Sequence, residues 1–199
     1  LGRHDQVRAA GDAVEQLHKN TAAELKIPAS DVDPLLAELR TLLTGISMLK
    51  EVTPRSRDYL VSFGERLSVR IMSSYLNSIG VRAEFKDAWD VGFISDSNYM
   101  NADLLPETWE NIRTKLGGYA SGKPGDGKPM PIVTGFIAKD QKGLITTLGR
   151  GGSDLTATLL GAALRAEEVQ TWKDVDGILT TDPRIVKEAR TVPVATYDE

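Results

Sequence analysis

A short glycine-rich segment, lying between an apolar run and a helix-like run, places the strongest constraint on this chain. Residues 147–154 read Thr-Leu-Gly-Arg-Gly-Gly-Ser-Asp and overlap the end of a β-rich run at 143–148. A strand that leads through glycines into a helix brings backbone N–H groups and the positive end of the helix dipole to one point. Glycine also allows close approach of a ligand and positive φ angles. The segment therefore predicts an anion-binding site.

The residues inside this segment do not identify the anion. Arg150 offers a planar guanidinium that can bind a carboxylate or a phosphate through two parallel hydrogen bonds. Ser153 or Asp154 is expected to cap the helix. The competing interpretation is a tight strand-to-helix turn with a capping acid, although such a turn needs no arginine between glycines. The segment also lacks the Gly-Lys-Ser/Thr end of a Walker A loop and does not match G-x-G-x-x-G.

The composition excludes several other classes of protein. Hydrophobic residues make up 41% of the chain and charged residues 26%, which is the balance of a folded globular protein. A formal net charge of −4 argues against broad nucleic-acid binding, and no apolar run reaches the ~20 residues of a membrane-spanning helix. Without cysteine, and with only His4 and His18 as imidazoles, we expect no metal site built on those residues and no Ser-His-Asp triad.

Helical and strand-like patterns alternate along the chain. Apolar residues at helical spacing dominate the first eighty positions, with a break expected near Gly64. Residues 117–131 hold five glycines and three prolines and indicate a surface loop. The alternation predicts an α/β layered fold with a mostly parallel sheet. We expect helices over 5–25, 33–49, 54–80 and 106–116 and from the glycine segment to 165, and strands over 81–85, 91–94, 131–138, 143–148 and 168–172.

A candidate carboxylate lies in the run Ser62-Phe-Gly-Glu-Arg66, where Glu65 stands beside the expected break in the helix. If Glu65 faces the same crevice as Arg150, the pair suits a zwitterion. The arginine would bind its α-carboxylate and the glutamate its α-ammonium group. The alternative is a solvated charge on a helix surface.

Residues 172–184 follow a predicted strand end, the place where open α/β sheets bind their ligands. Lys173 could neutralise phosphate charge, and Asp174 could hold a ribose or a metal-bound water. Trp172 is expected to pack in the core and Asp182-Pro183 to form a turn. The alternative is a hydrophilic loop of turn-forming residues.

The three segments together resemble the catalytic domain of aspartate kinase. The runs SFGERLS at 62–68, TTLGRGGSDLTA at 146–157 and WKDVDGILTTDPR at 172–184 occur in the order found in that family. Together with NADLLPETW at 101–109, these motifs are most similar in sequence to those of the plant and algal single-function enzymes. The likeness covers roughly residues 54–199. It implies the amino-acid kinase fold, a three-layer α/β/α sandwich.

The resemblance also implies a reaction and the residues that serve it. The reaction would transfer the γ-phosphoryl group of ATP, with Mg²⁺, to the side-chain carboxylate of L-aspartate. At position 179 this chain has Leu where many bacterial members have Tyr. The residues implied are Glu65, Arg150, Gly151, Gly152 and Ser153 for aspartate, Asp154 with Arg150 for catalysis, and Lys173, Asp174, Leu179 and Arg184 for the nucleotide.

Further expectations concern the extent and setting of the chain. The family opens with a strand bearing Lys-Phe-Gly-Gly-Thr-Ser-Val, which these residues lack. Residues 1–199 are therefore expected to form part of a kinase domain, inactive alone, without the regulatory ACT domains. The complete enzyme is expected to be a homodimer in the plastid stroma, with the cytoplasm as the alternative. Two other interpretations stay open: a kinase of the same fold for another amino acid or a nucleotide, and a non-catalytic anion-binding domain.

Overall fold

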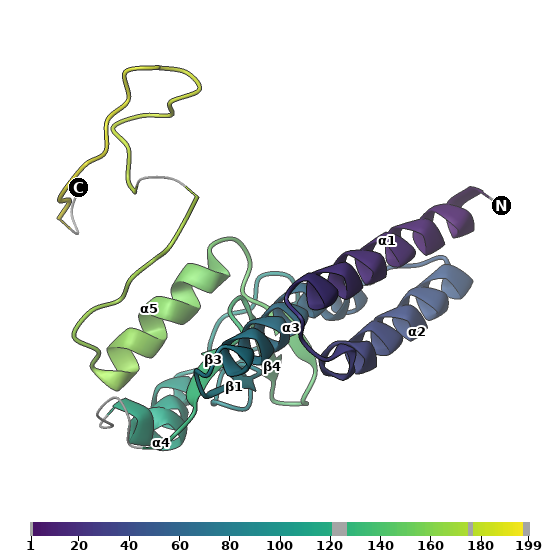
Figure 1. Ribbon diagram of the computed structural model, residues 1–199, viewed down its shortest axis with the longest axis horizontal. Helices are drawn as coiled ribbons and strands as arrows, with labels where there is room; N and C mark the ends of the chain where they lie inside the picture. Colours follow the sequence, from purple (N-terminus) through teal and green to yellow (C-terminus); the bar gives the residue numbers. More distant parts are fainter. Residues whose placement is uncertain (1, 121–126, 175–176, 197–199) are drawn as a thin grey trace. The chain divides into compact units, whose positions relative to one another are not determined.

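The computed structural model describes residues 2–120, 127–174 and 177–196 (Figure 1). The chain forms two compact units, Leu1–Glu167 and Glu168–Glu199. All the named helices and strands belong to the first unit. They are the helices α1 (Gly2–Glu24), η1 (Ala29–Asp31, a single 3-10 turn), α2 (Asp33–Leu49), α3 (Pro54–Ser78), α4 (Glu107–Ala120) and α5 (Gly152–Leu164), and the strands β1 (Ala83–Lys86), β2 (Ile94–Ser95), β3 (Met130–Val133), β4 (Ile137–Asp140) and β5 (Ile145–Thr147).

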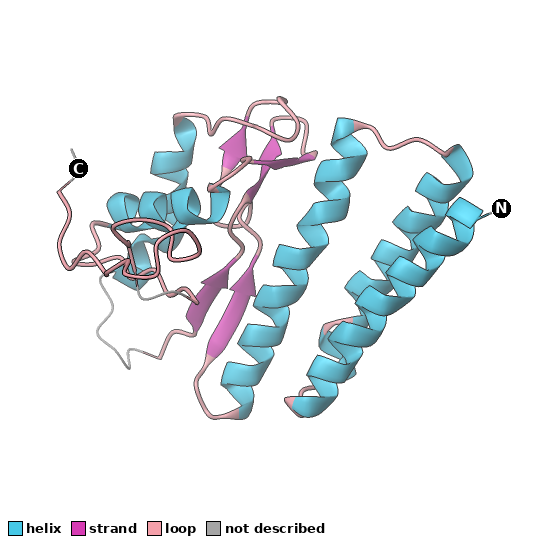
Figure 2. Cartoon of the chain, turned by 90° about the horizontal axis from the view of Figure 1, so that it is seen from above, coloured by secondary structure: helices cyan, strands magenta, loops and turns pink. Residues whose placement is uncertain are grey.

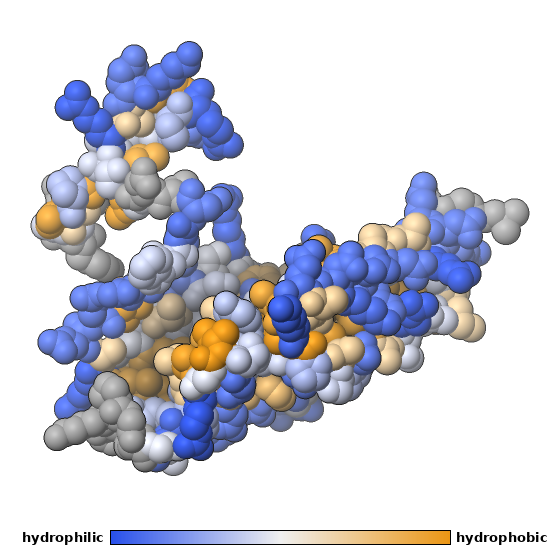
Figure 3. Space-filling view, in the orientation of Figure 1, coloured by the Kyte–Doolittle hydropathy of each residue, from blue (hydrophilic) through white to orange (hydrophobic). Residues whose placement is uncertain are grey.

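The first three helices pack against one another over their own apolar core. Helix α3 starts at Pro54, and the Thr53 side chain accepts a hydrogen bond from the Ser56 backbone N–H at 3.1 Å, as an N-cap should. The expected break at Gly64 is wrong, because α3 runs through it and buries Phe63 on one side. Most of α1 is exposed and hydrophilic (Figure 3). This core consists of Ala22, Ile27, Val32, Leu35, Leu36, Leu39, Phe63 and Leu67.

The strands form two small sheets. Strands β1 and β3 pair in parallel, while β4 pairs in parallel with β2 and antiparallel with β5. The α/β class is confirmed, but the one strand expected over 131–138 is two strands of different sheets. The chain bends between them, where Phe136 has a φ of +67°.

Helices lie on both sides of the strands (Figure 2). Helix α3 contacts β1, β3 and β5 on one side, and α4 packs against α5 on the other. The second core consists of Ala88, Val91, Phe93, Ala102, Ile112, Leu116, Ile137, Ala138, Leu148, Leu159 and Ala163. Helix α3 contacts strands of both sheets.

Two further segments differ from the sequence-based expectation. Residues 117–120 of the expected surface loop continue α4, and β3 begins at Met130; positions 121–126 lie outside the described residues. The strand expected over 168–172 does not form. Among the described helices, none is both long and apolar enough to cross a membrane.

Candidate functional site

The glycine segment joins β5 to α5 through two residues in the left-handed region. Gly149 has a φ of +71°, and Gly151, with a φ of +80°, is the N-cap of α5. The expectation that Ser153 or Asp154 caps the helix is wrong, because the helix begins at Gly152 and both residues lie in its first turn. Their side chains are exposed at the positive end of the helix.

Close packing explains why two of these positions are glycines. A β-carbon on Gly149 would lie 2.4 Å from the Asn101 Oδ1 atom. One on Gly152 would lie 3.0 Å from both Leu148 Cβ and Phe136 Cδ2. Asn101 and Phe136, both distant in sequence, therefore pack closely against the loop. An isolated strand-to-helix turn would not need these contacts.

The loop presents one cation to solvent. Arg150 lies between the glycines and is exposed, and among the described residues it forms no ion pair with a carboxylate. Asp154 is exposed one turn away. A guanidinium that is not engaged by an internal carboxylate is available for an external one.

Glu65 approaches the loop from α3. Its Oε2 atom accepts a hydrogen bond from the Gly135 backbone N–H at 3.2 Å. Gly135 in turn touches the start of α5, since a β-carbon there would lie 3.1 Å from Ser153 Cα. Burial raises the pKa of Glu65, and the Gly135 hydrogen bond opposes that rise. The structure thus brings Glu65 and Ser153 to the same glycine.

Sequence reasoning missed the segment that lies between them. At Phe136 the backbone N–H donates to Thr156 Oγ1 at 3.2 Å, and that hydroxyl donates to the Gly152 carbonyl at 2.8 Å. These bonds tie the bend between β3 and β4 to the first turn of α5. The signal was Gly135 itself, because a glycine inside an apolar strand run often marks a bulge or a close backbone approach.

The predicted nucleotide residues belong to the second unit. Lys173 and Asp174 are exposed there, and Leu179 is partly buried and pairs with Thr191 in an antiparallel bridge. Arg184 is paired with Asp182: its Nη2 donates to Oδ2 at 2.8 Å, and its backbone N–H donates to Oδ1 at the same distance.

Two details of the second unit bear on the sequence-based interpretation. The Asp182-Pro183 turn is confirmed, because the Ile185 N–H donates to the Asp182 carbonyl at 3.0 Å. The expectation that Trp172 packs in the core is wrong, since it is 87% exposed. The segment 168–172, which contains Trp172, forms no strand in which the indole could pack.

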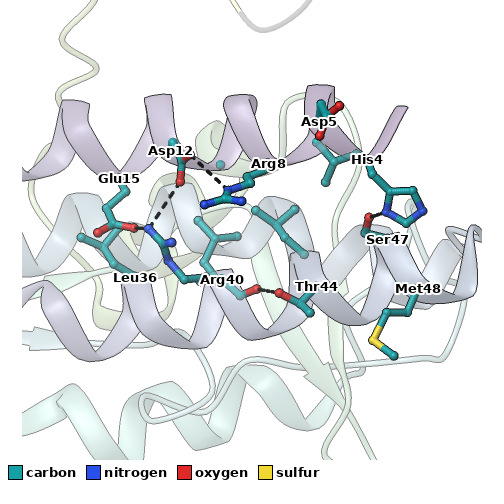
Figure 4. Close-up of a pocket in the computed structure, with 14 residues that line it drawn as sticks. His4, Asp5, Arg8, Asp12, Glu15, Leu36, Arg40, Thr44, Ser47 and Met48 are labelled. Carbon is teal, nitrogen blue, oxygen red and sulfur yellow. Dashed lines mark hydrogen bonds and ion pairs between the residues drawn. The ribbon is translucent and has the colours of Figure 1, made fainter. Parts of the chain in front are cut away.

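A separate cavity of about 440 Å³ lies between α1 and α2 (Figure 4). None of the predicted site residues lines it. Its charged groups are engaged with each other, since Arg40 pairs with Glu15 and with Asp12, and Arg8 pairs with Asp12 at 3.9 Å. We interpret it as a gap between two helices whose rims are held by ion pairs.

Comparisons with known proteins agree on one family. The sequence profile of the amino acid kinase family matches residues 7–199. The chain is 51% identical over 187 residues to aspartokinase 1, chloroplastic, of Arabidopsis thaliana, which covers 94% of this chain and 32% of that protein. It is 36% identical over 204 residues to the aspartokinase of Schizosaccharomyces pombe, covering 98% of this chain and 37% of that one.

Solved structures lead to the same family. The crystal structure of Escherichia coli aspartokinase III in complex with aspartate and ADP matches with a TM-score of 0.79 and 31% identity, over 92% of this chain and 40% of that one. The same enzyme in complex with lysine and aspartate matches with a TM-score of 0.67 and 30% identity, over 96% and 40%. This chain spans about a third of the length of its plant relatives.

Proposed function

Because this chain belongs to the amino acid kinase family, we propose that it is part of the catalytic domain of an aspartate kinase. The reaction transfers the γ-phosphoryl group of ATP to the side-chain carboxylate of L-aspartate and gives 4-phospho-L-aspartate and ADP. Its relatives in plants and fission yeast are named aspartokinases. The observation that carries the proposal is the convergence of Glu65 and the loop around Arg150 on Gly135.

The two charged groups suit the two charges on the α-carbon of an amino acid. Arg150 binds the α-carboxylate through its guanidinium fork, assisted by the backbone N–H groups of Gly151 and Ser153, while the Gly152 N–H donates to the Gly149 carbonyl and holds the turn in which the ligand is bound. Glu65 binds the α-ammonium group. A zwitterion held at both charges leaves its side-chain carboxylate as the group free to react.

The chemistry requires positioning and charge neutralisation rather than proton removal. An ordinary aspartate carboxyl has a pKa of ~3.9, so the nucleophile is already ionised at neutral pH. No general base is needed, and Asp154 therefore orients a cationic or metal-bound group beside the transferred phosphoryl. In-line geometry and neutralisation of the phosphate charge supply the catalysis.

The nucleotide falls to the second unit in this proposal, with Lys173 on the phosphates and Asp174, Leu179 and Arg184 along the same segment. Among the described residues there is no cluster of three or more acidic or histidine side chains that could hold a metal. The proposal includes Mg²⁺, an ion that is commonly bound by substrate phosphates plus one or two carboxylates. In this proposal Asp154 orients the metal-bound group, and the ion would supply charge neutralisation.

Three broader features belong to the same proposal. The complete domain is a three-layer α/β/α sandwich, which the helices on both sides of the strands support. The complete enzyme is a homodimer. It works in the plastid stroma, a location supported by chloroplastic relatives at 47–51% identity.

A panel of acceptors offered to the complete protein tests the proposal. ADP release with Mg-ATP is measured for L-aspartate, L-glutamate, N-acetyl-L-aspartate and no acceptor. We expect release with L-aspartate alone, since acetylation removes the ammonium group that Glu65 binds. Release with glutamate but not aspartate would identify another kinase of this fold. Aspartate binding without ADP release from any acceptor would identify a non-catalytic domain.

A further inference from the structure

A buried carboxylate on α3 anchors the root of the glycine loop. Asp58 is only 1% exposed. Its Oδ2 atom accepts hydrogen bonds from the backbone N–H groups of Met100 at 2.9 Å and Thr147 at 3.1 Å. Its Oδ1 atom accepts a third, from Thr147 Oγ1 at 2.8 Å. One carboxylate thus fixes two segments that lie 42 and 89 residues away in the sequence.

Of the two segments bonded to Asp58, one leads directly into the glycine loop and the other packs against it. Thr147 is the last residue of β5, two positions before Gly149. Met100 is followed by Asn101, whose Oδ1 atom crowds Gly149, and by Ala102, whose N–H donates to the Thr147 carbonyl at 2.8 Å. Asp58 therefore fixes the end of β5, and the chain continues from there through Gly149 to Arg150.

The same helix carries the other half of the site. Glu65 follows Asp58 by seven residues, which is two helical turns and about 10.5 Å along the axis, on the same face. Asp58 bonds the segment before the loop, and Glu65 bonds Gly135 beside Ser153. Helix α3 thereby sets the distance between the carboxylate-binding and the ammonium-binding groups.

We propose that Asp58 is a positioning residue for the acceptor site, which holds Arg150 at the distance from Glu65 that an α-amino acid requires. The inference rests on the proposed function. Its physical basis is the free-energy cost of removing a carboxylate from water, which is offset only where the carboxylate accepts several good hydrogen bonds. Bonds to an ionised acceptor are shorter and stronger than neutral ones, so they fix the strand end more tightly than a hydroxyl or an amide would.

The principal test is steady-state kinetics of Asp58→Ala in the complete protein, measured separately for acceptor and nucleotide. Loss of all three bonds lets Thr147 shift, and we expect the KM for aspartate to rise about tenfold or more while the KM for ATP changes less than about twofold. Asp58→Asn is the conservative variant, since its amide oxygen can accept both N–H groups and its amide nitrogen can donate to Thr147 Oγ1. It should restore the KM for aspartate to within about threefold of the wild type.

A matched control separates positioning from stability. Thr108 is fully buried in α4 and its hydroxyl bonds the Ile94 N–H and carbonyl, away from the loop. Thr108→Val should lower the thermal midpoint without raising the KM for aspartate. An unchanged KM for aspartate in Asp58→Ala, or equal rises in both KM values, would overturn the proposal. If Asp58→Ala does not fold, Asp58→Glu decides the question: its extra methylene displaces the anchored strand, and an unchanged KM contradicts our inference.

Hydrogen exchange provides a readout that does not depend on activity. In the ligand-free protein, Asp58→Ala should accelerate amide exchange over residues 147–152, while Thr108→Val should leave that segment protected. Unchanged protection in Asp58→Ala would refute the anchor even if the wild-type protein phosphorylates aspartate. Conversely, a wild-type protein that does not use aspartate would end the proposed function but leave the anchor to be judged by exchange alone.

Discussion

The two regions that serve the proposed reaction are built in different ways. The loop at 149–154 is held by groups from three distant segments: the buried Asp58 carboxylate bonds Thr147 just before it, Asn101 packs against Gly149, and Phe136 packs against Gly152. The segment at 172–184 is mostly exposed, and its ion pair, between Asp182 and Arg184, joins residues two apart. The acceptor side is therefore preorganised by tertiary packing, whereas the nucleotide side is organised by local hydrogen bonds. Substitutions should have larger and more specific effects on the first side than on the second.

The largest effect is expected from Arg150→Ala. Loss of a desolvated bidentate pair with the α-carboxylate typically costs ~2–5 kcal/mol, so the KM for aspartate should rise steeply while the KM for ATP stays close to that of the wild type. Steady-state kinetics on the complete protein measure both. Arg57→Ala, an exposed arginine of α3, is the control and should change neither. An unaltered KM for aspartate would remove Arg150 from the acceptor site.

Asp154→Asn should lower turnover about 10- to 100-fold, the usual cost of losing a group that orients a metal or a cation. The KM for aspartate should change little, because the proposed role of Asp154 concerns the transferred phosphoryl group and not the α-carbon groups. The control is Asp33→Asn, which also removes an acid from the first turn of a helix, here α2, away from the site. If turnover of Asp154→Asn matched the wild type, Asp154 would have no catalytic role.

A pair of glycine substitutions tests whether the loop is packed as tightly as its contacts indicate. A β-carbon at Gly152 meets Leu148 and Phe136 at 3.0 Å, so Gly152→Ala should lower the free energy of unfolding by ~1–3 kcal/mol. Gly64 is also within a helix, but a β-carbon added there would meet nothing within 4 Å, so Gly64→Ala should raise the free energy of unfolding by ~0.5–1 kcal/mol. Urea titration measures both changes. If both substitutions raised the free energy of unfolding, the loop would accommodate a β-carbon at Gly152 and would not be tightly packed.

The contrast between the two regions also explains what could be predicted from the sequence. The helices follow from apolar spacing, and the glycine loop follows from a strand-to-helix junction rich in glycine, both of which are local patterns. The partners of Glu65 and Asp58 lie 70 and 89 residues away, and no local pattern encodes such a pairing. The residue type of Trp172 predicts burial, but burial also depends on neighbours that the 168–172 segment does not provide.

The pH dependence of Glu65 is a smaller effect with a definite sign. Burial raises the pKa of Glu65, so the folded chain holds this proton more tightly than the unfolded chain does. The free energy of unfolding should therefore fall as the pH rises from about 4.3, the usual glutamate pKa, through the raised value. Glu65→Gln cannot ionise and should lose this part of the decline.

Two measurements follow from this sign. Urea titrations between pH 4 and pH 7 compare Glu65→Gln with Glu24→Gln, an exposed glutamate of α1 that should keep the wild-type profile. The KM for aspartate should rise as the pH falls through the same window, because only the ionised carboxylate binds ammonium. If the free energy of unfolding changed with pH in the same way in the wild type and in Glu65→Gln, the first expectation would be wrong. If the KM for aspartate did not rise as the pH falls, the second would be wrong.

The smallest effect is expected from Asp182→Asn on the nucleotide side. The hydrogen bonds from Arg184 lower the pKa of Asp182, but the pair is exposed and therefore screened by salt. Its loss should raise the KM for ATP by no more than about fivefold and leave the KM for aspartate unchanged. Glu188→Gln, another exposed acid of the same unit, serves as the control. A rise in the KM for ATP as steep as that of aspartate in Arg150→Ala would mean that the 172–184 segment is as firmly preorganised as the loop, and that the contrast between the two sides is false.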